Sequence, residues 1–451
     1  MPSPVLLTGA DCFLRAFDGE VRRYSGASHL SQLVLRLGPG FDPEALRKLL
    51  AEVASEIPIV RAPIGRPGGV AAPVYRLDRA SGAPLPRVEV HPEPTDAGGA
   101  ARPIPEVFFR RLNDTFAMRR GELLRFDVVP YRGGAEGTDL AMTWLHMLFD
   151  GSGSEAFVAW LAARASGEPA ELPDGGGMGD VTPPAMGAGR GREAQRWQRH
   201  MQGLAGRLPS GRTPRSLAGP LTKVRQDLRY EVESWTEAET AAISKRASEL
   251  AGFLTPMLFY LAASIRGHHA VLRARGVDPG SFVVPLPVNL RPKGGAGGIF
   301  RSHVSMLWFQ VAPEDTASLE GLIEVLKVQR REAIKGKLIE AGVAAMDYAR
   351  YAPAPLYSWL ARRSFGGELC SFFFAYTAEF LPGLDTFCGA PIEDGFHAPS
   401  VPASPGSSLI FSVQGGRLHR TYVSQQGVLT PEENALLTGQ LRADLFGAAG
   451  G

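Results

Sequence analysis

The chain has 451 residues, a formal net charge of +2 and 21% charged residues. This balance requires neither nucleic acid nor an acidic partner, so any electrostatic docking would have to be local. With 44% hydrophobic residues the chain is globular rather than disordered, and its length exceeds one typical core, so we expect two lobes.

Three cysteines, Cys12, Cys370 and Cys388, form neither a CxxC motif nor a metal-binding spacing with His. A disulfide framework and a zinc site are therefore not expected. The N-terminus lacks a basic segment followed by a long apolar core, and no stretch of about 18 apolar residues occurs in the sequence. We expect a cytoplasmic protein with no transmembrane segment, no metal and no permanently bound cofactor.

The first lobe is predicted to begin with a strand and a helix. The strand is expected at residues 29–37. Asp42 and Pro43 then provide an N-cap followed by proline at the first helical position. A hairpin follows, with predicted strands at residues 123–131 and 138–146.

The second strand of this hairpin ends in the motif HMLFDG, residues 146–151, which is the most informative stretch of the chain. Alternation along the strand places His146 on the face that carries Leu140, Met142 and Trp144. A histidine titrates close to neutral pH, so His146 is a candidate general base. The motif makes acyl transfer the leading functional hypothesis.

A helix is predicted directly after the motif, because Ser152 and Glu155 have the spacing of a capping box. The motif then lies in a strand-to-helix turn, where a side chain can face a cavity while its backbone stays anchored. The alternative is a histidine packed at a strand end, followed by an aspartate that starts a turn and has no chemical role.

Residues 167–220 are rich in Gly, Pro and Arg, and we place the boundary between the lobes here. The predicted domains are residues 1–166, the connection 167–220 and residues 221–451. A short helix is expected at residues 193–208. The connection carries a group of arginines, Arg192, Arg196, Arg199, Arg207, Arg212 and Arg215. They form either a solvated basic linker or a docking patch for phosphate or for an acidic carrier protein.

The second lobe is predicted to contain several strands and helices. Strands are expected at residues 227–232, 282–292, 302–311, 409–413 and 418–424, and helices start near Thr236, Thr255, Ser318 and Thr430. His268 and His269 look like a tandem catalytic pair, but no Asp-Gly follows four residues later, and we reject them as the active site. The glycines at residues 294–298 lack the Lys-Ser/Thr of a P-loop and indicate a mobile loop.

In this order, the pieces resemble the superfamily of chloramphenicol acetyltransferase, nonribosomal peptide condensation domains and bacterial wax ester synthase/diacylglycerol acyltransferases. The resemblance covers most of the chain. It rests on LTGADCFL at residues 7–14, IPIVRA at 57–62, HMLFDG at 146–151 and PVNLRP at 287–292. The HxxxDG motif and the Asn-x-Arg strand are the specific elements.

The resemblance implies two similar α/β lobes of the chloramphenicol acetyltransferase type that meet in a V, with the active-site tunnel at their interface. It implies that His146 faces this tunnel as the catalytic residue. Asp150 is implied to turn away from the substrate and to pair with Arg291, so that Asp150, Gly151 and Arg291 have structural roles in the motif.

Two departures from the superfamily pattern are visible. Condensation domains have two consecutive histidines, whereas Leu145 precedes His146 here, which is closer to the single-histidine acyltransferases. Residues 371–378 occupy the region where wax ester synthases carry a Ser-Asn segment, and no such segment is found there. Candidate tunnel residues are Trp144, Asn289, Tyr376 and Thr377, although for the last two a place in an aromatic core strand is the preferred interpretation.

The implied function is acyl transfer from a thioester donor, either acyl-CoA or an acyl carrier protein, to a hydroxyl or amine. The acceptor is a small molecule or a lipid, in lipid or secondary metabolite biosynthesis. His146 takes the acceptor proton as general base. No acyl-enzyme is required, so the cysteines are predicted to be dispensable. The alternative is a non-catalytic condensation-like module that binds a carrier protein or lipid, and the intact HxxxDG motif argues against it.

Overall fold

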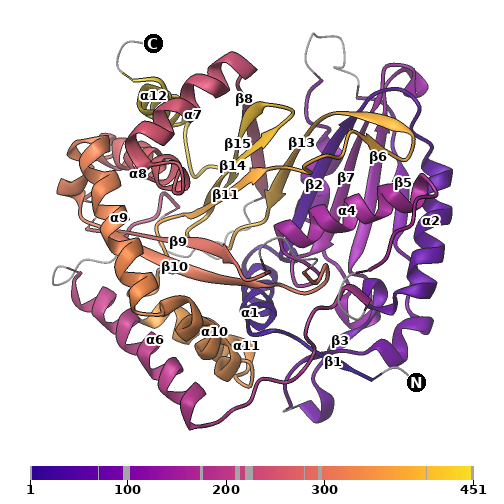
Figure 1. Ribbon diagram of the computed structural model, residues 1–451, viewed down its shortest axis with the longest axis horizontal. Helices are drawn as coiled ribbons and strands as arrows, with labels where there is room; N and C mark the ends of the chain where they lie inside the picture. The colour runs from indigo at the N-terminus through magenta and orange to yellow at the C-terminus, as the bar shows by residue number, and fades with distance from the viewer. Residues whose placement is uncertain are drawn as a thin grey trace.

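The computed structural model describes residues 3–69, 71–94, 102–172, 176–208, 214–218, 227–278, 280–292, 297–402 and 404–447. The helices and strands form two parts (Figure 1). One part is built mostly from the N-terminal half of the chain, and the other mostly from the C-terminal half. Each part has its own large apolar core. The loop expected at 294–298 lies mostly outside the described residues, and Arg212 lies outside them altogether.

The first part is built on a six-stranded sheet in the order β12-β13-β2-β7-β6-β5. Its strands are β12 (Thr386–Phe387), β13 (Ala390–Pro399), β2 (Leu30–Leu37), β7 (Thr138–Leu145), β6 (Leu124–Pro130) and β5 (Arg87–Val90). All neighbours are antiparallel except β5 and β6. The predicted hairpin of β6 and β7 is confirmed.

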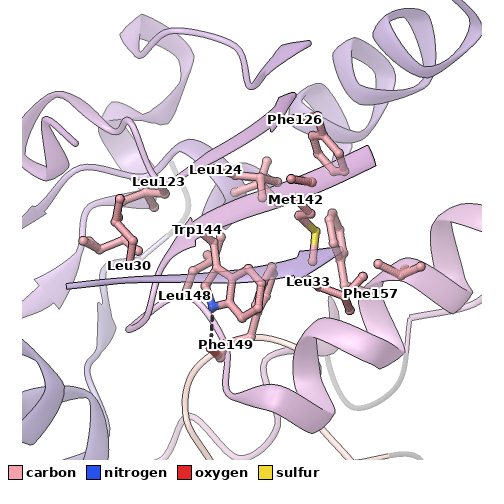
Figure 2. Packing of buried hydrophobic residues seen from close by; sticks show 14 of the residues in the cluster. Leu30, Leu33, Leu123, Leu124, Phe126, Met142, Trp144, Leu148, Phe149 and Phe157 are labelled. Atoms are coloured by element: carbon pink, nitrogen blue, oxygen red, sulfur yellow. Dashed lines mark hydrogen bonds between the residues drawn. The ribbon is translucent and has the colours of Figure 1, made fainter. Parts of the chain in front are cut away.

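Helix α4 (Gly151–Ala165) covers one face of this sheet (Figure 1). Trp144, Phe149 and Phe157 pack there with aliphatic residues of β2 and β6 (Figure 2). Helix α2 (Pro43–Glu56) packs against α4 and begins at the predicted cap, where the Asp42 side chain accepts from the backbone N–H of Glu44 at 2.8 Å.

Strand β13 crosses from the second part into the first sheet. It pairs antiparallel with β2 (Figure 1). In this register His397 lies opposite Leu33. The division into residues 1–166 and 221–451 therefore stays a proposal. Strands β12 and β13 come from the second range but belong to the sheet whose other strands come from the first.

The second part contains a four-stranded sheet, a hairpin and a layer of helices. The sheet has the order β11-β14-β15-β8. Its strands are β11 (Phe373–Glu379), β14 (Ser407–Gln414), β15 (Arg417–Gln425) and β8 (Leu228–Ser234), the hairpin is β9 (Phe282–Asn289) with β10 (Val304–Val311), and the helices are α7 (Glu237–Ala251), α8 (Met257–Ala274), α9 (Leu319–Lys335) and α12 (Pro431–Phe446). The predicted strands and helices of this half are confirmed to within a few residues at their ends.

Four helices lie around the junction of the two parts: α1 (Gly9–Tyr24), α6 (Ala188–Gly206), α10 (Leu338–Ala349) and α11 (Ala354–Arg363). Helix α6 packs on α10, and α1 packs on α10 and α11 (Figure 1). The helix expected at 193–208 thus begins earlier, at Ala188. The small elements β1 (Val5–Leu6), β3 (Ile64–Gly65), β4 (Val74–Tyr75) and α3 (Glu106–Leu112) complete the first part. None of the helices in the described ranges is long and apolar enough to cross a membrane.

Candidate active site

His146 lies in the turn directly after β7, as the motif predicts. Its backbone N–H donates to the carbonyl of His29 at 3.1 Å, which fixes the start of the turn to the neighbouring strand. Burial lowers the pKa of His146 below its usual value, while Asp150 and the nearby carbonyl groups act in the opposite direction. The imidazole is therefore neutral at physiological pH and available as a base.

Asp150 caps the helix that follows the turn. Its carboxylate accepts from the backbone N–H of Gly153 at 2.8 Å, and helix α4 begins at Gly151. The capping box expected at Ser152 and Glu155 is therefore wrong, and the helix begins two residues earlier than predicted. Asp150 is the effective cap because its charge also suits the positive end of the helix dipole.

Asp150 also forms the expected ion pair with Arg291. The guanidinium lies 2.9 Å from Oδ2, and the same oxygen accepts from the backbone N–H of His303 at 2.8 Å. Arg291 is held in turn by the carbonyl of Gly298 at 2.9 Å and by the side chain of Asn289. Both carboxylate oxygens thus accept from protein donors, which is the arrangement expected for a structural role of Asp150.

Backbone groups from the second half of the chain also bind this turn. The N–H of Arg301 donates to the carbonyl of Leu148 at 2.6 Å, and Phe149 forms an isolated parallel bridge with Arg301. The next N–H, of Ser302, donates to Asp11 on helix α1 at 2.8 Å. The segment before β10 therefore ties the motif to the N-terminal helix.

The two glycines at the start of α4 differ in the space around them. A Cβ atom on Gly153 would lie 2.3 Å from the carbonyl oxygen of Ile299, which is a backbone clash. A Cβ atom on Gly151 would meet only His397, at 3.8 Å, an ordinary contact. The steric requirement for glycine thus falls on Gly153, and the packing around Gly151 does not explain why the motif contains a glycine there.

Two further histidines lie beside His146, and sequence reasoning missed both. The rings of His29 and His146 are 5.3 Å apart, and His397 is close enough for His146 to lower its pKa. Burial lowers the pKa of His29 and of His397 to about 3, so both rings are neutral. His29 is the first residue of the strand predicted at 29–37 and could have been found from the strand register, whereas His397 is brought to the site by a long-range strand pairing that has no local signal.

His397, on β13, contacts two polar side chains of helix α4. Its Nε2 lies 3.2 Å from Oγ of Ser154, and its Nδ1 lies 3.8 Å from Oε1 of Glu155. Burial raises the pKa of Glu155 to about 8, so this carboxyl group is protonated at neutral pH. The contact is therefore one between two neutral groups and links β13 to the helix that carries the motif.

The four predicted tunnel residues fall in different surroundings. Trp144 is buried in the core, where its Nε1–H donates to the carbonyl of Phe149 at 2.9 Å (Figure 2), so we assign it no substrate contact. Asn289 supports Arg291 and lies 3.4 Å from Ser152 Oγ. Tyr376 stacks on Tyr260 in the second core, with ring centroids 5.1 Å apart. The hydroxyl of Thr377 is buried and has no hydrogen-bond partner in the described part of the chain.

A groove of about 980 Å³ lies between α1, α6, β10, α10 and α11, and more of its lining is apolar than polar. Aromatic rings connect it to the motif. Phe13 lines the groove and contacts Phe17 at 4.3 Å between ring centroids, and Phe17 lies 5.9 Å from His29, the neighbour of His146. These ring contacts therefore link the groove to the candidate base through His29.

One group among the described residues has the spacing of metal ligands: Glu89, His91 and Asp127. Glu89 lies on β5, His91 follows that strand and Asp127 lies on β6. Arg111 already pairs with the two carboxylates. The guanidinium of Arg111 is 2.9 Å from Asp127 and also bonds Glu89. A cation there would face a resident positive charge, so we assign this group to a salt-bridge network.

Solved structures with this arrangement of elements cover almost the whole chain. The first condensation domain of the calcium-dependent antibiotic synthetase matches with a TM-score of 0.69 and 15% identity, over 99% of this chain and 96% of that one. The chain has the condensation-domain fold. The fold predicted from the HxxxDG and Asn-x-Arg segments is thereby confirmed.

Other members of the fold group match similarly. The starter condensation domain of rhizomide synthetase RzmA, in complex with C8-CoA, gives a TM-score of 0.65 and 14% identity over 99% of this chain and 95% of that one. TRI3 trichothecene 15-O-acetyltransferase from Fusarium sporotrichioides gives 0.66 and 13% over 98% and 95%. No family model matches the sequence, and no curated protein does. The likeness is therefore one of fold.

Proposed function

We propose that the protein is an acyltransferase that moves an acyl group from a thioester to a hydroxyl or amine, with His146 as general base. The observation that carries this proposal is the state of His146: a partly buried, neutral imidazole in a turn fixed by Asp150 and Arg291. The condensation-domain fold and two neighbours, one named as an acetyltransferase and one bound to C8-CoA, support it.

The proposed reaction is a direct transfer. Neutral His146 takes the proton of the acceptor, and the resulting nucleophile attacks the thioester carbonyl. The tetrahedral intermediate then collapses, and the imidazolium returns the proton to the departing thiolate. The buried hydroxyl of Thr377, which lacks a partner in the described residues, is a candidate donor to the oxyanion.

No covalent acyl-enzyme is expected on a cysteine. Burial raises the pKa of Cys12 and of Cys388 to about 12 and raises that of Cys370, so none of the three thiols ionises readily. A stable acyl adduct, seen by intact mass after a single turnover, would contradict direct transfer.

The donor is proposed to be acyl-CoA or an acyl carrier protein, since both present a phosphopantetheine arm. The groove beside α1 supports a bulky, partly apolar substrate. On α6, Arg192, Arg196 and Arg199 are exposed, which leaves both the solvated linker and the docking patch for an acidic carrier open.

The test is free-thiol release from acyl-CoA donors of two to sixteen carbons, with pooled alcohol and amine acceptors and mass analysis of products. Acceptor-dependent release with an ester or amide product is expected. If CoA donors give none, acyl carrier proteins are tested in the same assay. Failure with both kinds of donor, together with tight binding of a carrier protein, would instead favour a non-catalytic condensation-like module.

A further inference from the structure

His29 is placed beside the candidate base by the sheet itself. It precedes β2, and the register of β2 and β7 pairs Leu30 with Leu145. Continuing this register by one residue places His29 opposite His146. The backbone N–H of His146 donates to the His29 carbonyl at 3.1 Å. The two imidazole rings lie 5.3 Å apart with an interplanar angle of 39°.

The protein fixes which nitrogen of His29 carries the proton. Nε2 lies 3.2 Å from the backbone carbonyl of Ser400, and a carbonyl can only accept a hydrogen bond. Nε2 is therefore protonated in the neutral ring, and Nδ1 is left as an acceptor. Nδ1 is buried and has no partner among the described residues, and the residue is 4% exposed.

A buried acceptor without a partner is unusual in folded proteins, and beside a catalytic base it indicates a ligand that supplies the missing donor. We propose that His29 is a substrate-binding residue, whose Nδ1 accepts a hydrogen bond from a second N–H or O–H group of the acyl acceptor. This inference rests on the proposed function. Because burial holds the pKa of His29 at about 3, the ring stays an acceptor at neutral pH and does not compete as a base.

The chemistry selects a class of acceptor. His146 removes one proton from the nucleophile, so the hydrogen bond to His29 needs another donor on or next to the same atom. A primary amine has a second N–H, and a vicinal diol or an amino alcohol has a neighbouring O–H. A secondary amine or an isolated alcohol has no such donor and would leave the buried Nδ1 without a partner.

Two variants separate this role from a structural one. His29→Gln keeps an N–H that can reach the Ser400 carbonyl but removes the acceptor at the position of Nδ1. His29→Asn keeps an acceptor near Nδ1 and loses the bond to Ser400. Each is assayed for kcat/KM with a primary amine and its N-methyl analogue, and with a vicinal diol and its mono-alcohol.

Wild type is expected to prefer the two-donor acceptor of each pair by roughly 10- to 100-fold. His29→Gln should lower kcat/KM for the two-donor acceptor much more than for the one-donor acceptor and so abolish that preference, and His29→Asn should retain most of it. An unchanged preference in His29→Gln, an equal loss for both acceptors, or a change confined to the KM of the thioester would overturn the inference.

A second measurement does not depend on turnover. In protein labelled with ¹⁵N-imidazole, with His29→Gln used for assignment, the His29 resonances should show the Nε2–H form from pH 5 to 8. The Nδ1 signal should shift on addition of the primary amine and not of its N-methyl analogue. A proton on Nδ1, or no shift with either amine, contradicts the inference. If wild type transfers no acyl group, the proposed function fails, and this measurement still decides the role of His29.

Discussion

His146 can take a proton only while its ring is neutral, so its pKa sets the lower pH limit of the reaction. Burial lowers that pKa below the usual 6.5. For a general base, kcat/KM rises as the pH increases through the pKa and is constant above it. We predict a rising limb centred below pH 6.5 and a plateau from about pH 7, measured with an alcohol acceptor that does not itself titrate. A limb above pH 6.5 would mean that His146 is not desolvated in the free enzyme.

Gly153 and Gly151 offer a matched pair of substitutions in one helical turn. Gly153→Ala forces a Cβ against the Ile299 carbonyl, whereas Gly151→Ala adds an ordinary contact with His397. We predict that Gly153→Ala lowers the free energy of unfolding by about 1–3 kcal/mol and that Gly151→Ala changes it by less than about 0.5 kcal/mol. Urea unfolding of both variants measures this difference, and equal effects would show that the junction with Ile299 relaxes easily.

Candidate site residues could be predicted from the sequence where a short, continuous segment carries the signal. His146, Asp150 and Arg291 were found because the motif and the strand that bear them are short and continuous. Alternation places Trp144 on the strand face that carries His146, but the chain turns after Leu145 and the Trp144 ring is buried in the core. Alternation gives the face of a strand and does not show which residues on that face reach the site.

At the scale of elements, the ion pair of Asp150 and Arg291 connects α4 to the segment after β9. Both side chains are largely buried, at 6% and 11% exposure. Removing one partner leaves the other charge buried and unpaired, which costs about 3–5 kcal/mol. Asp150 also caps α4 and accepts from His303, so Asp150→Ala is predicted to destabilise more than Arg291→Ala.

A double-mutant cycle, followed by urea unfolding, measures the interaction free energy between Asp150 and Arg291. The double variant should lose less than the sum of the two single losses, because it leaves no unpaired charge. Each single variant should also lower kcat, since the His146 turn loses an anchor. Strictly additive losses of stability would contradict a coupled pair and would leave Asp150 as a helix cap only.

Elements were predicted best where capping residues and alternation coincide, as in the Asp42 and Thr236 helices and the β6–β7 hairpin. The predicted start of α4 is two residues late because two capping patterns overlap: the Asp150 carboxylate accepts from the N–H of Gly153, so the helix begins at Gly151 and Ser152 lies inside its first turn. The pairing of β13 with β2 has no signal in either strand alone. It depends on packing between segments that are distant in the chain.

At the scale of the molecule, the second half of the chain supports a turn that belongs to the first. Arg291, Arg301 and His303 each contact the segment from Leu148 to Asp150, and β13 brings His397 beneath the first turn of α4. The position of His146 therefore depends on both parts of the fold, which sequence could suggest only through the resemblance to a two-lobed superfamily.

The most direct test of the account is acceptor-dependent thiol release by wild type and by His146→Ala, with His269→Ala as the matched control. His269 lies on α8 and bonds Thr316, outside the candidate site. His146→Ala should lower kcat/KM by about 100- to 10,000-fold with an unfolding transition close to that of wild type, and His269→Ala should stay active. A folded His146→Ala protein that releases thiol at the wild-type rate would contradict the account.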